Sequence, residues 1–289
     1  MIKTFLQRSA LGQQEERGSR RSVIHRVKAS MNKQEDSSPT LVETAPERDQ
    51  RFRQLRRLVY DERYRLRLLI GFSLLAFAVV AALAAISYLY QTVPFDLATT
   101  YELQEPRGAW FGQLMVALSW PGNLPWSLVV VGTGTIAVGL WLGWKEGAFL
   151  LAAIGVQGII NTLVKTMVGR PRPSSDLVDV LREVSGNSFP SGHVMFYTVF
   201  FGLIFFLALT RLPRTLLRWI VLLVSGGLVV LIGPSRIFLG AHWLSDVVAG
   251  YLLSFVLLGF AIEFHLRYLG PVVVKEKAKG TPPPDRVEP

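Results

Sequence analysis

The chain has 289 residues, of which 50% are hydrophobic and only 18% are charged, and its mean hydropathy is +0.34. A soluble domain of this size usually carries more charge, so the composition indicates an integral membrane protein. The formal net charge is +10, and the basic residues lie beside apolar segments. This pattern favours anchoring at anionic lipid headgroups, and we expect no nucleic-acid partner. Because the sequence has no cysteine, disulfides and thiolate-bound metals are excluded.

The two ends of the chain differ from its apolar middle. Residues 1–50 are polar, without a sustained apolar period, and we expect a disordered cytoplasmic tail. Residues 51–67 are rich in arginine with interspersed leucines, a pattern that indicates a basic juxtamembrane helix at the interface. Residues 266–289 contain the run Pro282–Pro284 and are predicted to form a second cytoplasmic tail.

Between these tails, residues 68–265 predict an all-α, polytopic membrane bundle with six transmembrane helices. The first candidate span, Leu68–Tyr90, is uncharged and long enough to cross about 30 Å of hydrocarbon. Residues 91–125 contain the apolar run Leu114–Trp120, which is too short to cross, so we expect an interfacial or re-entrant helix there. The six predicted spans are 68–90, 126–144, 148–168, 193–210, 217–233 and 246–262.

The distribution of Lys and Arg predicts the orientation. The two tails, the turn at Lys145 and the turn Arg211–Arg218 are basic and fall on one side of six spans. We therefore expect cytoplasmic termini and a place in the plasma (inner) membrane. His265 then lies at the cytoplasmic end of the last span, where we interpret it as an interface residue. The segments expected on the extracytoplasmic face are 91–125, 169–192 and 234–245.

The first chemical motif is Lys165 followed by Arg172-Pro173, at the end of the third span. A charge inside an apolar span is costly unless it is paired or near the interface, and a lone lysine would snorkel to the surface. Because Arg170 and Arg172 follow without matching acids, the pattern instead favours an anion site, and guanidinium groups bind phosphoryl oxygens well. With Arg172 as the phosphate ligand, we interpret Arg170 as a surface cation near the headgroups.

The second motif, Pro190-Ser191-Gly192-His193, opens the fourth span. Ser191 is typical of an N-cap, which is its structural interpretation. Gly192 permits close approach to the backbone, and the amides of a helix N-terminus bind phosphate, so both roles are compatible. His193 is either an interface residue or the acid that the chemistry needs at neutral pH.

The third motif joins Ser235-Arg236 to His242 and Asp246. The i, i+4 spacing places His242 and Asp246 on one face of a helix that begins by His242. A carboxylate on one imidazole nitrogen fixes the tautomer and leaves the other nitrogen nucleophilic. Asp246 is alternatively a capping residue. Arg236 supplies a third cation for a phosphate.

The three motifs together, K-x6-R-P from Lys165, P-S-G-H from Pro190 and S-R-x5-H-x3-D from Ser235, resemble the signature of the type 2 phosphatidic acid phosphatase superfamily. That superfamily includes lipid phosphatases, undecaprenyl-diphosphate phosphatases, glucose-6-phosphatase and soluble vanadium haloperoxidases. The resemblance covers about residues 68–265 and is silent on the N-terminal tail. It implies a membrane hydrolase that acts on a lipid phosphate or diphosphate.

The resemblance also implies a role for each matching position. His242 attacks phosphorus and forms a phosphohistidine, Asp246 orients and polarises it, and His193 protonates the leaving oxygen and then activates water. The positions implied to bind the phosphate are Lys165, Arg172, Ser191, Gly192 and Arg236. No metal and no cofactor are implied.

Several alternatives stay open at this point. The same phosphohistidine serves a phosphotransferase, in which an alcohol replaces water, and a phospholipid-binding protein without turnover is a non-catalytic alternative. A haloperoxidase is disfavoured because those relatives are soluble. The substrate is not specified, although Arg170 and Arg182 slightly favour a polyisoprenyl diphosphate through a second phosphate. The oligomeric state is also not specified by the sequence.

Overall fold

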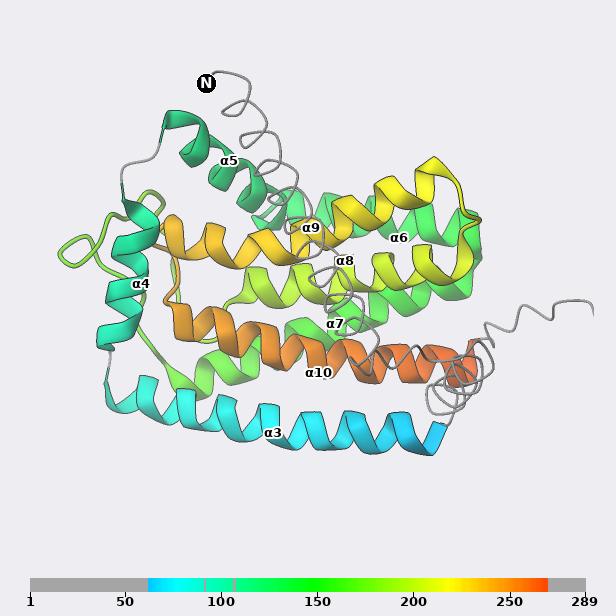
Figure 1. Ribbon diagram of the computed structural model, residues 1–289, viewed down its shortest axis with the longest axis horizontal. Helices are drawn as coiled ribbons and strands as arrows, with labels where there is room; N and C mark the ends of the chain where they lie inside the picture. The colour runs from blue at the N-terminus through cyan, green and yellow to red at the C-terminus, as the bar shows by residue number, and fades with distance from the viewer. Residues whose placement is uncertain (1–61, 91, 106–107, 270–289) are drawn as a thin grey trace, which may run out of the picture. The chain divides into compact units, whose positions relative to one another are not determined.

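The computed structural model describes residues 62–90, 92–105 and 108–269, and within these ranges the only regular elements are helices (Figure 1). The predicted tail 1–50 and most of the predicted juxtamembrane helix 51–67 lie outside the described residues. The last part of 51–67 continues into the first spanning helix, which begins at Glu62. The final helix ends at Tyr268, so most of the predicted tail 266–289 also lies outside the described residues.

The prediction of an all-α bundle of membrane-spanning helices is confirmed. Five helices are long and apolar enough to cross a bilayer: α3 (Glu62–Leu89), α7 (Trp144–Val168), α8 (Gly192–Arg211), α9 (Leu216–Phe238) and α10 (Leu244–Tyr268). Between α3 and α7 lie α4 (Pro94–Gln104), α5 (Ala109–Ser119), the 3-10 turn η1 (Trp120–Gly122) and α6 (Trp126–Leu142). One further span is long and apolar enough only if two segments are taken together, Ala109–Gly122 and Trp126–Leu142. The two segments meet at a bend of 65°. The predicted span 126–144 is therefore part of a broken span or a re-entrant loop.

Helix α9 continues beyond the predicted span end at Gly233, through Pro234 to Phe238. A proline inside a helix removes the hydrogen bond to the carbonyl four residues earlier, here that of Val230. The Tyr251 hydroxyl of α10 donates to the carbonyls of Val229 at 2.7 Å and Val230 at 3.2 Å. It also accepts from the Gly233 N–H at 3.1 Å. This partner for the freed backbone groups explains why the helix persists where the sequence predicted a loop.

Helix α8 is the most enclosed of the spanning helices and forms the centre of the core. It packs against α7, α9 and α10. Aromatic residues of this helix pack against one another. The ring centroids of Phe196 and Phe200 are 5.5 Å apart in a stacked arrangement, and those of Phe200 and Phe201 are 5.1 Å apart, edge to face. Since His193 lies in its first turn, the second motif stands on a rigidly packed helix.

The opposite end of the bundle holds a buried ionic cluster. Glu146, in the first turn of α7, accepts from Arg211 of α8 at 2.9 Å and pairs with His265 of α10 at 2.7 Å. His265 is fully buried. The interpretation of His265 as an interface residue is therefore wrong, because a glutamate 119 residues earlier supplies a partner within the bundle.

Replacing Glu146 with Gln keeps the side-chain size but removes the charge shared by Arg211 and His265. Arg211 is partly exposed, so solvent screening weakens the contribution of its ion pair with Glu146 to stability. We expect a loss of about 2 kcal/mol, since hydrogen bonds to charged groups contribute at that level, and a Tm lower by roughly 5 °C. Thermal unfolding in detergent measures this, with Glu183→Gln in an exposed loop as the control. An unchanged Tm for Glu146→Gln would show that the cluster contributes nothing.

Candidate active site

The three motifs meet at one end of the helical bundle, at the left in Figure 1. They come from the end of α7, the start of α8, the end of α9 and the start of α10. Gly169 ends α7 in the left-handed conformation (φ 65°), and its N–H donates to the carbonyl of Lys165 at 3.0 Å. Glycine adopts this conformation without a Cβ penalty, so the helix stops one turn after Lys165. The chain then enters the loop 169–191.

His242 lies in the short connection between α9 and α10. Its backbone N–H and that of Ala241 both donate to the carbonyl of Arg236, at 3.3 and 3.1 Å. The connection therefore folds back on the last turn of α9 and brings His242 next to Arg236. Only 1% of His242 is exposed. Helix α10 begins at Leu244, so His242 precedes the helix that the i, i+4 argument placed it on.

The tautomer of His242 follows from its neighbours. The Arg172 guanidinium has only donors, and one of its nitrogens lies 3.2 Å from Nε2 of His242. Nε2 therefore carries the lone pair, and Nδ1 carries the proton. Nδ1 lies 3.3 Å from the hydroxyl of Ser188 and 3.6 Å from a carboxylate oxygen of Asp246. This arrangement leaves the lone pair on Nε2, the nitrogen that a nucleophilic His242 would use.

The carboxylate of Asp246 is held from several sides. One oxygen accepts from the Ser188 hydroxyl at 2.5 Å and from the backbone N–H of Trp243 at 2.8 Å. The separation of 3.6 Å from His242 is longer than a hydrogen bond, so Ser188 links the two groups. Its hydroxyl accepts from the imidazole and donates to the carboxylate. The proximity expected from the motif is present, with a serine between the partners that the motif did not indicate.

Arg170 is not the surface cation that the sequence suggested. Its side chain is fully buried and forms ion pairs with Asp246 at 2.7 Å and with Asp96 of α4 at 2.8 Å. It also donates to the Ser245 hydroxyl at 2.6 Å. Asp96 in turn accepts from the backbone N–H and the hydroxyl of Ser245, both at 2.8 Å. This burial was not evident from the sequence because Asp96, which neutralises the charge of Arg170, lies 74 residues away in the chain.

Lys165 and Arg172 are anchored by backbone carbonyls. Lys165 Nζ donates to the carbonyl of Asn187 at 2.5 Å, and the Asn187 side chain donates back to the carbonyl of Lys165 at 2.9 Å. Arg172 donates to the carbonyls of Gly186 at 3.0 Å and Ala241 at 2.8 Å. Neither cation forms a salt bridge with an acid in the described part of the chain. Their positive charges are therefore directed at the site without being neutralised.

Several buried polar atoms in the second and third motifs have no hydrogen-bond partner among the described residues. One guanidinium nitrogen of Arg236 donates to the Ser119 hydroxyl, but its Nε and its second terminal nitrogen have none. The Ser191 hydroxyl also has none, although Ser191 occupies the N-cap position of α8 directly before Gly192. Because buried polar groups are nearly always paired, these atoms indicate a ligand that offers several acceptors.

His193 is held at the edge of the same site. Its Nε2 lies 3.2 Å from Oδ1 of Asn123, and its ring stacks on that of Tyr197 at 6.5 Å. It is within electrostatic range of His242 and Arg236. These contacts place the ring inside the protein and not at the lipid interface, and its role as the acid stays a prediction.

The electrostatics of the site favour a neutral imidazole at His242. Burial, followed by the charges of Arg172, Arg236 and Lys165, holds the pKa of His242 well below its usual 6.5. Burial also lowers the pKa of Arg172, and Asp246 partly opposes this shift. An imidazole that stays neutral keeps its lone pair for attack at neutral pH.

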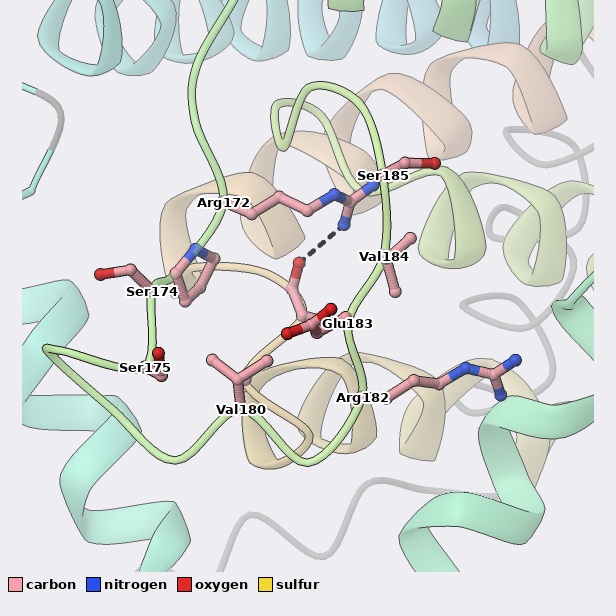
Figure 2. A pocket seen from close by; sticks show the side chains of 11 residues that line it. Arg172, Ser174, Ser175, Val180, Arg182, Glu183, Val184 and Ser185 are labelled. Carbon is pink, nitrogen blue, oxygen red and sulfur yellow. Dashed lines mark hydrogen bonds between the residues drawn. The ribbon is translucent and has the colours of Figure 1, made fainter.

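A polar pocket of about 390 Å³ opens beside the site (Figure 2). Residues of the loop from Arg172 to Ser185 and the turn Gly240–Ala241 line it. The dashed line in Figure 2 is the hydrogen bond that Arg172 donates to the carbonyl of Ala241. Arg172, which lines this pocket, also contacts His242. Arg182 and Glu183 also line the pocket.

Some contributors were missed by the sequence analysis. Asp96, Ser119 and Asn123 come from the region before α7, and Ser188 comes from the loop before the second motif. The one usable signal was Asp96, the first acid after the predicted span 68–90. The serines and Asn123 belong to common turn and helix-end compositions, which point to no particular chemistry.

We expect His242 to remain neutral, with the proton on Nδ1, at pH 6.5 and below, because its pKa lies well under that value. Imidazole ¹⁵N spectra of histidine-labelled protein in detergent measure this, and His242→Gln assigns the signal by its loss. In Arg172→Gln a positive charge is removed, so the pKa of His242 should rise. A His242 that titrates above pH 6.5 in the unaltered chain, or that carries its proton on Nε2, would contradict the geometry.

The chain is similar to known lipid phosphatases. Residues 146–268 match the model of the PAP2 superfamily. Phosphatidylglycerophosphatase B of Bacillus subtilis (strain 168) is 29% identical over 162 residues, which cover 53% of this chain and 77% of that protein. The lipid A 1-phosphatase of Rhizobium etli is 27% identical over 149 residues, 49% of this chain and 59% of that protein, so the chain spans about three fifths of its length.

Among solved structures, the crystal structure of a transmembrane PAP2-type phosphatidylglycerolphosphate phosphatase from Bacillus subtilis is similar, with a TM-score of 0.59 and 25% identity. The match covers 68% of this chain and 96% of that one. All three motifs lie within the matched region 146–268. Over this region the chain is similar to the PAP2 superfamily.

Proposed function

We propose that this protein is an integral membrane phosphatase that hydrolyses a lipid phosphate or diphosphate through a phosphohistidine on His242. The observation that carries the proposal is that a neutral imidazole lies near buried hydrogen-bond donors that have no partner among the described residues. Nε2 of His242 has a lone pair, while Arg236 and Ser191 hold buried polar atoms without partners among the described residues. A phosphoryl group satisfies those donors and presents its phosphorus to the nitrogen. The match of residues 146–268 to the PAP2 superfamily model supports the same class of reaction.

The proposed reaction has two steps. Nε2 of His242 attacks phosphorus, the bond to the lipid oxygen breaks, and His193 gives a proton to that oxygen. Water then attacks the phosphohistidine while His193 takes the proton back, and inorganic phosphate leaves with His242 neutral again. Lys165, Arg172 and Arg236 stabilise the charge on the equatorial oxygens in both steps.

The donor set around the phosphate consists of cations and hydrogen-bond donors. No group of three or more His, Asp or Glu side chains suited to a metal ion occurs among the described residues. Lys165, Arg172 and Arg236 would repel a divalent cation and themselves supply the positive charge that such an ion provides in other phosphatases. We therefore propose a metal-independent reaction.

Replacing His242 with Gln should abolish release of inorganic phosphate from lipid phosphates, with a loss of at least about 10³-fold, because the nucleophile is removed. His25→Gln, outside the phosphatase region, is the matched control and should keep full activity. Activity of the unaltered chain should persist in excess chelator. Turnover by His242→Gln, or its abolition by chelator in the unaltered chain, would refute the proposed mechanism.

A lipid substrate is supported by an apolar groove beside the polar pocket. The groove has a volume of about 630 Å³ and is lined by one face of α5, by Trp120 and by Leu181. Leu181 lines the groove and Arg182 lines the polar pocket, so a single loop separates the two cavities. A phosphate in the pocket leaves its hydrocarbon chain near the groove, where burial contributes about 0.8 kcal/mol per methylene.

Substituting Ala117 with Trp fills the groove and should reduce kcat/KM for a long-chain lipid phosphate by about tenfold or more, a loss equivalent to burying two methylenes. Turnover of a water-soluble phosphate monoester should change little, because it does not use the groove. Leu114→Trp, on α5 but outside the groove lining, serves as the control for an added indole. Equal losses for lipid and soluble substrates in Ala117→Trp would contradict this assignment.

The second-phosphate argument for a diphosphate is weaker than the sequence suggested. The charge of Arg170 is buried and paired with Asp96 and Asp246. Arg182 remains at the polar pocket, but Glu183 lines the same space and disfavours a second anion there. We therefore propose a lipid phosphate as the substrate class without preferring the diphosphate.

We also propose that both termini are cytoplasmic and that the site faces the extracytoplasmic side of the inner membrane. The support is the charge distribution: Lys145, Arg211 and Arg218 lie at the bundle end opposite His242. Basic residues near span ends are favoured on the cytoplasmic side.

The absence of native cysteine makes this orientation testable. A cysteine at Ser174, an exposed residue of the polar pocket, should react with an impermeant maleimide added to intact cells. A cysteine at Lys277 should react only after the membrane is permeabilised. The reverse pattern of labelling would overturn the orientation and would leave the chemistry of the site untouched.

A further inference from the structure

The turn that follows η1 places an amide side chain on the ring of His193. Asn123 donates through Nδ2 to the carbonyls of Ser119 at 3.1 Å and Trp120 at 3.2 Å. Both partners are acceptors only, so the nitrogen of the amide is assigned by its contacts. The oxygen of the amide, Oδ1, is then the atom 3.2 Å from Nε2 of His193.

This contact determines the tautomer of His193. An amide oxygen only accepts, so Nε2 must carry a proton, and in the neutral ring the lone pair is on Nδ1. The ring is also confined sterically: a Cβ on Gly122 would lie 2.5 Å from Cδ2 and 2.9 Å from Nε2. Tyr197 stacks against the ring, and its hydroxyl donates to the carbonyl of Leu118 at 2.7 Å. The edge of the ring that bears Nε2 therefore faces the turn.

We propose that Asn123 is a positioning residue that holds His193 with Nε2–H bonded to the amide and Nδ1 directed to proton exchange. The proposal rests on the phosphatase function proposed above. When the ring is protonated, Nδ1–H passes its proton to the leaving oxygen while Nε2–H stays on Asn123. The Nδ1 lone pair then accepts the proton of the attacking water. One proton leaves and one returns, so the ring ends each turnover unchanged.

The proposal adds a segment to the working site. Asn123 precedes the region 146–268 that matches the superfamily model. The same segment also supplies Ser119, whose hydroxyl accepts from Arg236. The bent unit of α5, η1 and α6 thereby supports both the proposed acid and one of the proposed phosphate ligands.

Leaving-group dependence tests the proposal, because a general acid matters for an alkoxide and little for a nitrophenolate. In Asn123→Ala, kcat/KM should fall about tenfold to a hundredfold for a short-chain phosphatidic acid and by less than about threefold for p-nitrophenyl phosphate. Thr133→Val, exposed on α6, is the control and should change neither value. His193→Gln should show the same selective loss, and adding Asn123→Ala to it should cause little further loss.

Equal losses on the two substrates, or losses that add in the double variant, would overturn the positioning role. If Asn123→Ala does not fold, the imidazole ¹⁵N spectrum of the unaltered protein decides. The proposal requires the neutral His193 ring to be protonated on Nε2, and protonation on Nδ1 would refute it. Failure of the phosphatase function itself would appear separately, as absence of phosphate release from both substrates by the unaltered chain.

Discussion

The rest of the site depends on the two ion pairs made by the buried guanidinium of Arg170. It is shared by Asp96 of α4 and Asp246 of α10, and none of the three side chains is exposed. Removing one partner from such a group typically costs about 3–5 kcal/mol, because an uncompensated charge stays buried. The pairs fasten α4 and the loop after α7 to the start of α10. They also hold the carboxylate that receives the Ser188 hydroxyl beside His242.

With Asp246 and Asp96 occupied by Arg170, the other cations of the site keep their charge for a ligand. Arg172 directs a donor at Nε2 of His242, and Arg236 retains two buried nitrogens without a partner among the described residues. Burial, together with the resulting positive potential, lowers the pKa of His242, and that potential attracts a dianion. In the proposed reaction, the same groups keep His242 neutral for attack and bind the phosphate. Catalysis would then depend on preorganised charge, which needs no rearrangement as the transition state forms.

The sequence predicted the features that are local and failed on those that depend on distant partners. The spans follow from apolar length, and the motif residues from their spacing at span ends. The burial of Arg170 was missed because its partner Asp96 lies 74 residues away. The continuation of α9 through Pro234 was missed because Tyr251 of another helix satisfies the freed carbonyl. Asn123 stands in a Pro-Gly-Asn turn, whose composition indicates only a turn.

The central claim, a covalent intermediate on His242, is tested most directly by trapping it. The His193→Gln variant should be phosphorylated by ³²P-labelled p-nitrophenyl phosphate, whose leaving group needs no acid, while attack by water is slowed. After a rapid quench in alkaline detergent, the account predicts a base-stable, acid-labile label on the peptide that contains His242. A label on another side chain, or phosphate release with no covalent label at any quench time, would contradict it.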